Sequence, residues 1–316
     1  MTATTERVNK KASGRQPPSR DRGGMTNLGQ STLTPYLFSS PAIIAVTAIL
    51  AFPVLYGIWQ SLYRPEVLGA PAQFVGLQNY IDTFTDPDFG NALYRTMVFA
   101  GGSIIVSTVL GLFFAFALYR ASHRLRVLRS ITIAPYLISS VAAAVMFRIL
   151  FNGQFGLVNV ALGSIGIEGP VWFADRTWAM AVVIFTQVWT DLPLTVLLLL
   201  GGLMTVDRSY LDAALVDGAT GFRRAIHVTI PLLTPQLLIT IIWMSYSTVT
   251  GLGIVLPLTG GGPQGATNTL AMEMYITAFQ ELNFHEGLAI ATFVIVLNAL
   301  LTLLYIRVGR RFEVEA

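Results

Sequence analysis

The sequence predicts an all-α, polytopic membrane protein with six transmembrane helices. Three observations support this class: the composition, a series of long apolar segments and the placement of the basic residues. Only 12% of the 316 residues are charged and 53% are hydrophobic, whereas soluble domains carry about 25% charged residues. A chain so poor in charge cannot cover a globular surface with polar side chains, so lipid is its expected solvent.

The N-terminal residues 1–33 are polar, basic and rich in Ser, Gly and Pro. This composition predicts a disordered tail. The apolar segment that follows is too long for the core of a signal peptide and lacks a clear Ala-x-Ala cleavage site, which favours a retained helix. We therefore expect a transmembrane domain over residues 34–310 and a short C-terminal tail over 311–316.

Six apolar segments are long enough to cross a bilayer, which takes about 20 residues. A helix is the expected conformation because it satisfies its own backbone hydrogen bonds in lipid. In chain order the segments are 36–62, 94–119, 130–151, 177–203, 233–258 and 286–307.

The basic residues indicate the orientation. Most of the 20 Lys and Arg residues lie in the N-terminal tail, in 120–129, in 208–224 and in 307–311. Connecting segments on the cytoplasmic side of membrane proteins are enriched in these residues. Both termini and the segment around 208–224 are therefore predicted to be cytoplasmic, in a multi-pass cell-membrane protein.

Several classes of function are disfavoured by what the chain lacks. It has no cysteine, and His123, His227 and His285 lie far apart, so we expect no metal site. We find no phosphate-binding loop, HExxH, GxSxG or paired acids, so we expect no catalytic residues and no ATP hydrolysis by this chain. The net charge of +3 could suggest nucleic-acid binding, but the clustering of arginines beside the apolar segments favours membrane orientation instead.

The polar segment Tyr210–Leu233 separates the fourth and fifth apolar segments. Thr205, Asp207 or Ser209 could cap a helix at its start. Taken alone, the segment has the pattern of an amphipathic helix at the membrane interface.

The same segment also resembles the EAA loop of bacterial ABC importer permeases. That resemblance implies a cytoplasmic coupling loop over 205–231, which docks on the ATP-hydrolysing subunit. Asp212 stands where the family usually has Glu, which shortens the reach of the charge. The implied coupling residues are Asp212, Ala213, Ala214, Asp217, Gly218, Ala219, Phe222 and Pro231.

A second motif reads Leu-Thr-Gly-Gly-Gly-Pro over 258–263. Such a Gly- and Pro-rich stretch could be a plain connecting turn. It also resembles the LTxGGP motif of sugar-type permeases. In this respect the chain is similar to the larger permease subunit of the maltose and glycerol-phosphate family, in the form that has six helices. The implied outer-loop residues are Gly261, Gly262 and Pro263. The resemblance extends over about 36–310.

Polar residues inside apolar helices usually face the protein interior or a cavity. When the chain is aligned on these motifs, the resemblance implies that several of these polar residues occupy sugar-contacting positions of the maltose-type subunit. Asp191 stands where that subunit has a small residue. Hydrogen bonding between helices is the alternative role. The predicted substrate-path residues are Tyr136, Ser140, Gln187, Trp189, Asp191, Tyr246, Ser247 and Thr248.

The resemblance implies the type I ABC importer transmembrane-domain fold and a carbohydrate or related solute moved by alternating access. The implied partners are a second permease subunit, two ATPase subunits, an extracytoplasmic solute-binding protein and membrane lipid, with no nucleic acid. This chain would bind no cofactor, since ATP and Mg²⁺ belong to the ATPase. An ion-coupled secondary transporter is the alternative, although the chain shows no inverted repeat.

Overall fold

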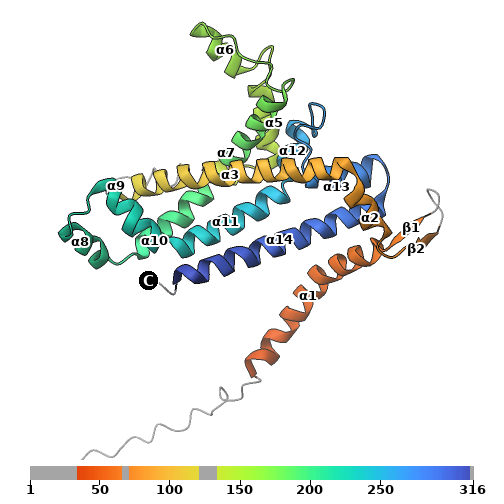
Figure 1. Cartoon of the computed structure of the whole chain (residues 1–316), viewed down its shortest axis with the longest axis horizontal. Helices are drawn as coiled ribbons and strands as arrows, with labels where there is room; N and C mark the ends of the chain where they lie inside the picture. Colours follow the sequence, from red (N-terminus) through yellow and green to blue (C-terminus); the bar gives the residue numbers. More distant parts are fainter. Residues whose placement is uncertain (1–33, 66–70, 121–133, 314–316) are drawn as a thin grey trace, which may run out of the picture. The chain divides into compact units, whose positions relative to one another are not determined.

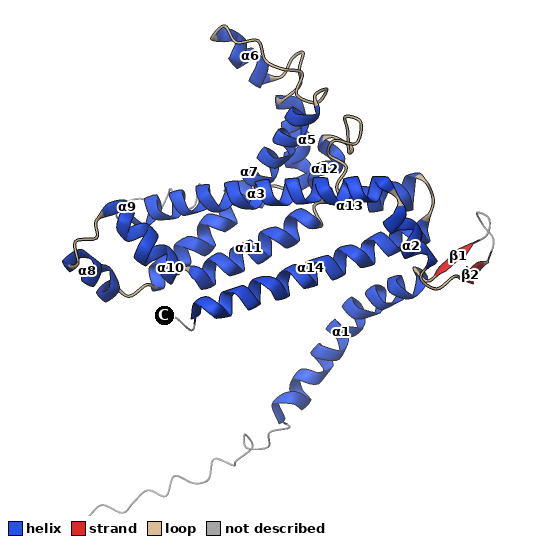
Figure 2. Cartoon of the chain, viewed as in Figure 1, coloured by secondary structure: helices blue, strands red, loops and turns tan. Residues whose placement is uncertain are grey.

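The computed structural model describes residues 34–65, 71–120 and 134–313. These residues are almost entirely helical, apart from one short pair of strands (Figure 2). The predicted N-terminal tail lies outside the described residues. Contacts divide the chain into two units, Met1–Val54 and Leu55–Ala316. The class predicted from the sequence, an all-α protein, is confirmed.

Helix α1 spans Thr34–Gln60 and crosses the boundary between the two units. It contains Pro41 and Pro53, and no residue in its most apolar 18-residue window is buried. In the second unit the chain continues into strand β1 (Tyr63–Pro65), which pairs antiparallel with β2 (Ala72–Phe74).

Four helices of the second unit lie side by side (Figure 1). Apolar side chains from these helices form buried clusters, one of which contains Leu199, Leu203 and Leu233. The four helices are α3 (Pro87–Arg120), α7 (Arg176–Thr205), α11 (Thr234–Val249) and α14 (Phe284–Glu313).

Small residues allow these helices to approach closely. A Cβ atom at Gly111 of α3 would lie 2.4 Å from Thr195 Cγ2 of α7. A Cβ at Gly202 of α7 would lie 2.5 Å from Gln236 Cγ of α11. Glycines at such contacts let membrane helices pack backbone against side chain without the hydrophobic driving force available in water.

The remaining elements lie around these four helices, with α5, α6 and α12 above the middle of α3 in the view of Figure 1. Helices α8 and α9 lie at one end, and α2 and α13 lie at the other (Figure 1). The elements are α2 (Gln78–Thr85), η2 (Ala134–Leu137), α5 (Ser140–Leu150), α6 (Leu157–Ser164), α8 (Arg208–Val216), α9 (Gly221–Arg224), the π-helical η3 (Ala225–Thr229), α10 (Ile230–Leu232), α12 (Leu252–Leu258), α13 (Leu270–Tyr275) and the π-helical η4 (Ile276–Gln280).

The predicted count of six spans remains a prediction. Within the described residues, α1, α3, α7 and α14 are long and apolar enough to cross a membrane, and 221–232 with α11 forms a pair bent by 73°. The third predicted segment, 130–151, contains only η2 and the 11-residue α5 in its described part. The fifth, 233–258, is divided between α11 and α12. Hydropathy does not detect such interruptions because they do not change the average composition.

Candidate translocation site and coupling segment

Two polar side chains of α7 meet one of α11 in the centre of the second unit. Gln187 and Asp191 are four residues apart, so they lie on the same face of α7. Ser247 faces them from α11. Gln187 and Asp191 are only 2% and 5% exposed.

These three side chains form a closed hydrogen-bonded cluster. Gln187 Nε2 donates to Asp191 Oδ2 at 2.6 Å and to Ser247 Oγ at 3.1 Å. The Ser247 hydroxyl in turn donates to Asp191 Oδ2 at 3.2 Å. Gln187 Oε1 is buried and has no hydrogen-bond partner. A buried acceptor without a partner carries a desolvation cost, which a ligand or water can remove by donating a hydrogen bond to it.

A cavity of about 100 Å³ adjoins this cluster. It lies where the chain breaks between α11 and α12, and Gly251 is required at this break. A Cβ there would lie 2.9 Å from the Ser247 carbonyl oxygen. The cavity is lined by Ser140, Gln187, Thr190, Asp191, Ser247, Gly251, Gly253 and Ile254.

Four of the eight predicted substrate-path residues therefore meet around one cavity: Ser140, Gln187, Asp191 and Ser247. The other four do not line it. Tyr136 and Tyr246 are largely exposed, the Trp189 ring packs against the Phe147 ring, and the Thr248 hydroxyl donates to the Met244 carbonyl.

The bonds from Ser247 to Gln187 and Asp191 join two helices, so the interhelical role is present as well. Sequence reasoning missed Thr190, Gly251, Gly253 and Ile254 as lining residues. The pair of glycines inside an apolar segment was an available signal, because isolated glycines weaken a helix and often mark a break or a close approach.

The Gly- and Pro-rich loop after α12, which the sequence predicts to be an outer loop, is folded around the buried Thr267 rather than forming a plain turn. Thr267 Oγ1 donates to the Gly262 carbonyl at 2.7 Å, and its side chain also contacts the Thr259 hydroxyl. Gly261 has φ +87°, a left-handed conformation that glycine adopts without strain. Gly262 and Pro263 of this loop, together with Arg148 of α5, line a separate cavity of about 340 Å³.

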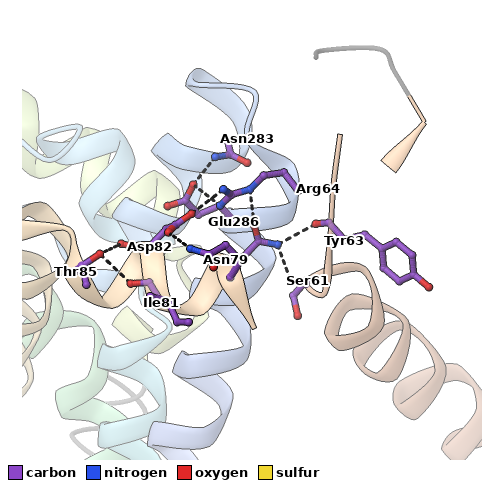
Figure 3. A network of polar contacts seen from close by, with 10 residues as sticks. Ser61, Tyr63, Arg64, Asn79, Ile81, Asp82, Thr85, Asn283 and Glu286 are labelled. Atoms are coloured by element: carbon purple, nitrogen blue, oxygen red, sulfur yellow. Dashed lines mark hydrogen bonds and ion pairs between the residues drawn. The ribbon is translucent and has the colours of Figure 1, made fainter. Parts of the chain in front are cut away.

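Arg64 joins three elements at the same end of the helices (Figure 3). From β1 it donates to Asn79 Oδ1 and Asp82 Oδ2 of α2, each at 2.7 Å, and approaches Glu286 of α14 to 4.0 Å. The hydrogen bond from Arg64 holds the pKa of the Asp82 carboxyl below its usual range. Sequence reasoning did not find this network, since its members are spread from residue 64 to residue 286.

At the opposite end of the helices, the predicted coupling residues lie on α8, on the turn that joins it to α9, on α9 and, for Pro231, on α10. Asp207 caps α8 by accepting a hydrogen bond from the Ser209 backbone N–H, as one of the three predicted caps. That bond lowers the pKa of the Asp207 carboxyl. Ala214 is buried, whereas Asp212, Ala213, Asp217, Gly218 and Pro231 are exposed and Ala219 is half-buried.

Two apolar side chains project from this polar segment. Val216 is 88% exposed and Phe222 is 81% exposed. Gly218 between them has φ +78°, and nothing lies within 4 Å of the position its Cβ would take. This glycine is therefore needed for the turn itself. Exposed apolar residues beside charged ones are typical of a docking surface for another protein.

Comparison with known proteins assigns the chain to a family. The model of the family described as "binding-protein-dependent transport system inner membrane component" matches residues 107–314. The chain belongs to this family. It is thus the membrane permease component of a transport system rather than an enzyme, and the secondary-transporter alternative is set aside.

Curated relatives are similar to this permease over most of its length. It is 32% identical to the trehalose/maltose transport system permease protein MalF of Thermococcus litoralis, covering 87% of this chain and 93% of the relative. It is 30% identical to the sulfoquinovosyl glycerol transport system permease protein SmoG of Agrobacterium fabrum, covering 87% and 89%. It is also 30% identical to the sn-glycerol-3-phosphate transport system permease protein UgpA of the same organism, covering 85% and 92%.

A solved structure has the same fold. A chain from a bacterial ABC transporter involved in the import of the acidic polysaccharide alginate superposes with a TM-score of 0.74. The match covers 88% of the permease and 95% of that chain, at 20% sequence identity. The fold of an ABC importer permease, predicted from the sequence, is thereby confirmed.

Proposed function

We propose that this permease moves a carbohydrate or related solute through the membrane part of an ATP-driven importer. The observation that carries the proposal is the buried polar cavity at the break between α11 and α12. A few convergent polar groups are typical of a site that orients a solute. At about 100 Å³ the cavity is smaller than such sites usually are, so it would have to widen during transport to hold a sugar. The trehalose/maltose, sulfoquinovosyl glycerol and glycerol-phosphate permeases among its relatives support this class of solute.

The working importer would contain this chain, a second permease, two ATPase subunits and a solute-binding protein outside the cytoplasm. One similar solved structure is of the alginate ABC transporter with a periplasmic protein that carries an alginate pentasaccharide. The segment around Val216, Gly218 and Phe222 would dock on an ATPase subunit, which alone would bind ATP and Mg²⁺. Its exposed apolar side chains support this role.

The transport step would follow from alternating access between two states. The loaded binding protein would dock at the end that carries the outer loop, and ATP would act through α8 and α9 at the opposite end. Each ligand biases the equilibrium because it binds one state more tightly. The arginine distribution supports an orientation in which both termini and α8 face the cytoplasm.

Replacing Gly218 with Arg tests the coupling role. A bulky side chain at φ +78° would strain the turn and stand between the permease and the ATPase surface. We expect intact membrane insertion, with the rates of solute-stimulated ATP hydrolysis and of uptake reduced about tenfold, which corresponds to about 1.4 kcal/mol in activation free energy. The measurement is ATPase activity and uptake in proteoliposomes containing the co-purified subunits.

Gly166→Arg is the matched control. Gly166 also has φ +78° and nothing within 4 Å of its Cβ position, but it follows α6 rather than α8. The control should retain the ATPase subunits on purification. Full coupling in the Gly218→Arg importer would contradict the assignment, as would a chain that purifies without any ATPase.

A further inference from the structure

In the cluster of Gln187, Asp191 and Ser247, the side-chain donors are engaged in hydrogen bonds within the cluster, whereas some acceptors remain available. Both hydrogens of the Gln187 amide point at Asp191 and Ser247, and the Ser247 hydroxyl points at Asp191. What remains for a ligand is the other lone pairs of the Asp191 carboxylate and the unpartnered Gln187 Oε1. The opposite amide orientation would place two acceptors 2.6 Å apart, so the chemistry favours the arrangement described.

Few side-chain donors elsewhere on the cavity wall balance these acceptors. The Thr190 hydroxyl donates to the Thr186 carbonyl of its own helix at 2.9 Å. Ser140 supplies one hydroxyl from α5. Among the side chains of the wall, acceptors therefore outnumber donors.

No cation compensates the Asp191 carboxylate within the described part of the chain. The ion pairs found there both belong to Arg64, at the end of the helices. Arg148 lines the neighbouring cavity, which shares no lining residue with this one, and it donates to the Pro257 carbonyl at 3.2 Å. Asp191 thus faces the cavity with only neutral hydrogen-bond donors beside it.

From this arrangement we infer that the central site selects against negative charge. It takes a carbohydrate that carries no anionic group and that donates hydroxyl hydrogens to Asp191 and Gln187 Oε1. A second negative charge beside a buried carboxylate is repelled strongly because water screens it poorly there. This inference rests on the proposed function and narrows its solute class. It separates this permease from its relatives named for glycerol-phosphate and sulfoquinovosyl glycerol.

The absence of cysteine from the sequence allows a direct test without knowing the solute. Ser140→Cys places a single thiol on the cavity wall with little change in volume. In the assembled importer, the thiol is reacted with two methanethiosulfonates, one bearing trimethylammonium and one bearing sulfonate. Neutral methyl methanethiosulfonate reports access, and mass spectrometry of this chain gives each rate.

We expect the cationic reagent to react faster than the anionic one, and Asp191→Asn to reduce that rate ratio about tenfold, because Ser140 and Asp191 line the same cavity and unit charges interact strongly where water is scarce. Ser139→Cys is the control, because Ser139 is exposed and does not line the cavity. Its rate ratio should be the same with Asp or Asn at 191. The inference would be overturned if the ratio of the two reaction rates at Ser140→Cys were the same with Asp or Asn at position 191. It would also be overturned if the neutral reagent did not react with this thiol.

A second measurement addresses the solute itself. Small molecules retained by the cognate binding protein after purification from cells are identified by mass spectrometry, and we expect a sugar without a phosphate, sulfonate or carboxylate group. An anionic sugar there would overturn the inference while leaving the importer assignment standing. Failure of the proposed function would be recognised separately, by purification of the chain without ATPase subunits.

Discussion

Arg64 shows how one side chain holds three elements in register. Its guanidinium reaches Asn79 and Asp82 through different nitrogens, while Asn79 donates to the backbone carbonyls of Ser61 and Tyr63. Asn79 is fully buried, so losing its partner would leave a buried polar group unsatisfied. The hairpin and α2 are consequently joined by directional hydrogen bonds.

Replacing Arg64 with Met should release the hairpin without unfolding the long helices. We expect faster amide hydrogen exchange in β1 and β2, and unchanged exchange in the middle of α7. Arg64→Lys should give an intermediate rate, because an ammonium group cannot reach both partners with the planar geometry of guanidinium. Equal exchange in all three proteins would contradict the role given to Arg64.

The same network sets a pH dependence. Because the hydrogen bond from Arg64 holds the pKa of Asp82 in the folded protein below its ordinary value, the ion pair stabilises the fold fully above that ordinary value. The contribution is lost as the pH falls through the lowered folded pKa. The exchange rates of β1 and β2 should therefore be insensitive to Asp82 ionisation between pH 5 and 8, after correction for intrinsic exchange.

At the scale of elements, α3 and α7 are held by close approach at glycine positions. Gly111 and Gly102 both face α7, at Thr195 and Ile184 respectively, whereas Gly101 has nothing within 4 Å of its Cβ position. Of the two adjacent glycines, only one serves the contact. The helical period decides which one, because neighbouring residues point about 100° apart around the axis.

Gly111→Ala should destabilise the permease, and Gly101→Ala should not. The added methyl group at 111 would overlap Thr195 Cγ2, and overpacking of this kind costs about 1–3 kcal/mol. Thermal unfolding of the purified complex in detergent measures the difference between the two variants. Equal midpoints would show that α3 and α7 can move apart at no cost.

For the molecule as a whole, the arginine distribution predicts which end faces the cytoplasm. We expect α8 on the cytoplasmic side and the turn after α6 outside. Gly218→Cys and Gly166→Cys provide thiols at two exposed positions with the same φ of +78°. A membrane-impermeant maleimide added to intact spheroplasts should label the Gly166→Cys protein alone. Labelling of Gly218→Cys instead would reverse the orientation.

Much of the fold was predictable because it depends on local sequence. The long helices α1, α3, α7 and α14 were expected from continuous apolar segments, and Asp207 was among the expected caps. Their ends were less predictable, since α3 begins at Pro87 rather than near residue 94. The break at Gly251 was missed because the apolar segment continues through it, and only packing around Ser247 and Ser140 shows why the helix stops.

The candidate site was partly predictable for a similar reason. The spacing of Gln187 and Asp191 placed them on one face of a helix, and the polar stretch at 246–248 was visible in the sequence. Which of those three neighbours faces α7 depends on the rotation of α11, and the structure selects Ser247. The aromatic residues Trp189 and Tyr246 lie on other faces of the same helices, so proximity in sequence was misleading for them.

The sequence by itself determined that the chain is a membrane permease with a Gly-containing segment that resembles a coupling loop. Composition and short motifs are properties of the chain, and they survive without knowledge of its packing. Only the tertiary structure decided that Ser140, Gln187, Asp191 and Ser247 share one cavity, and that Arg64 reaches Glu286. Asp191 and Ser247 are 56 positions apart and Arg64 and Glu286 are 222 positions apart. Such residues meet only once the rotation and contact faces of the helices are fixed, which depends on side-chain packing throughout the molecule.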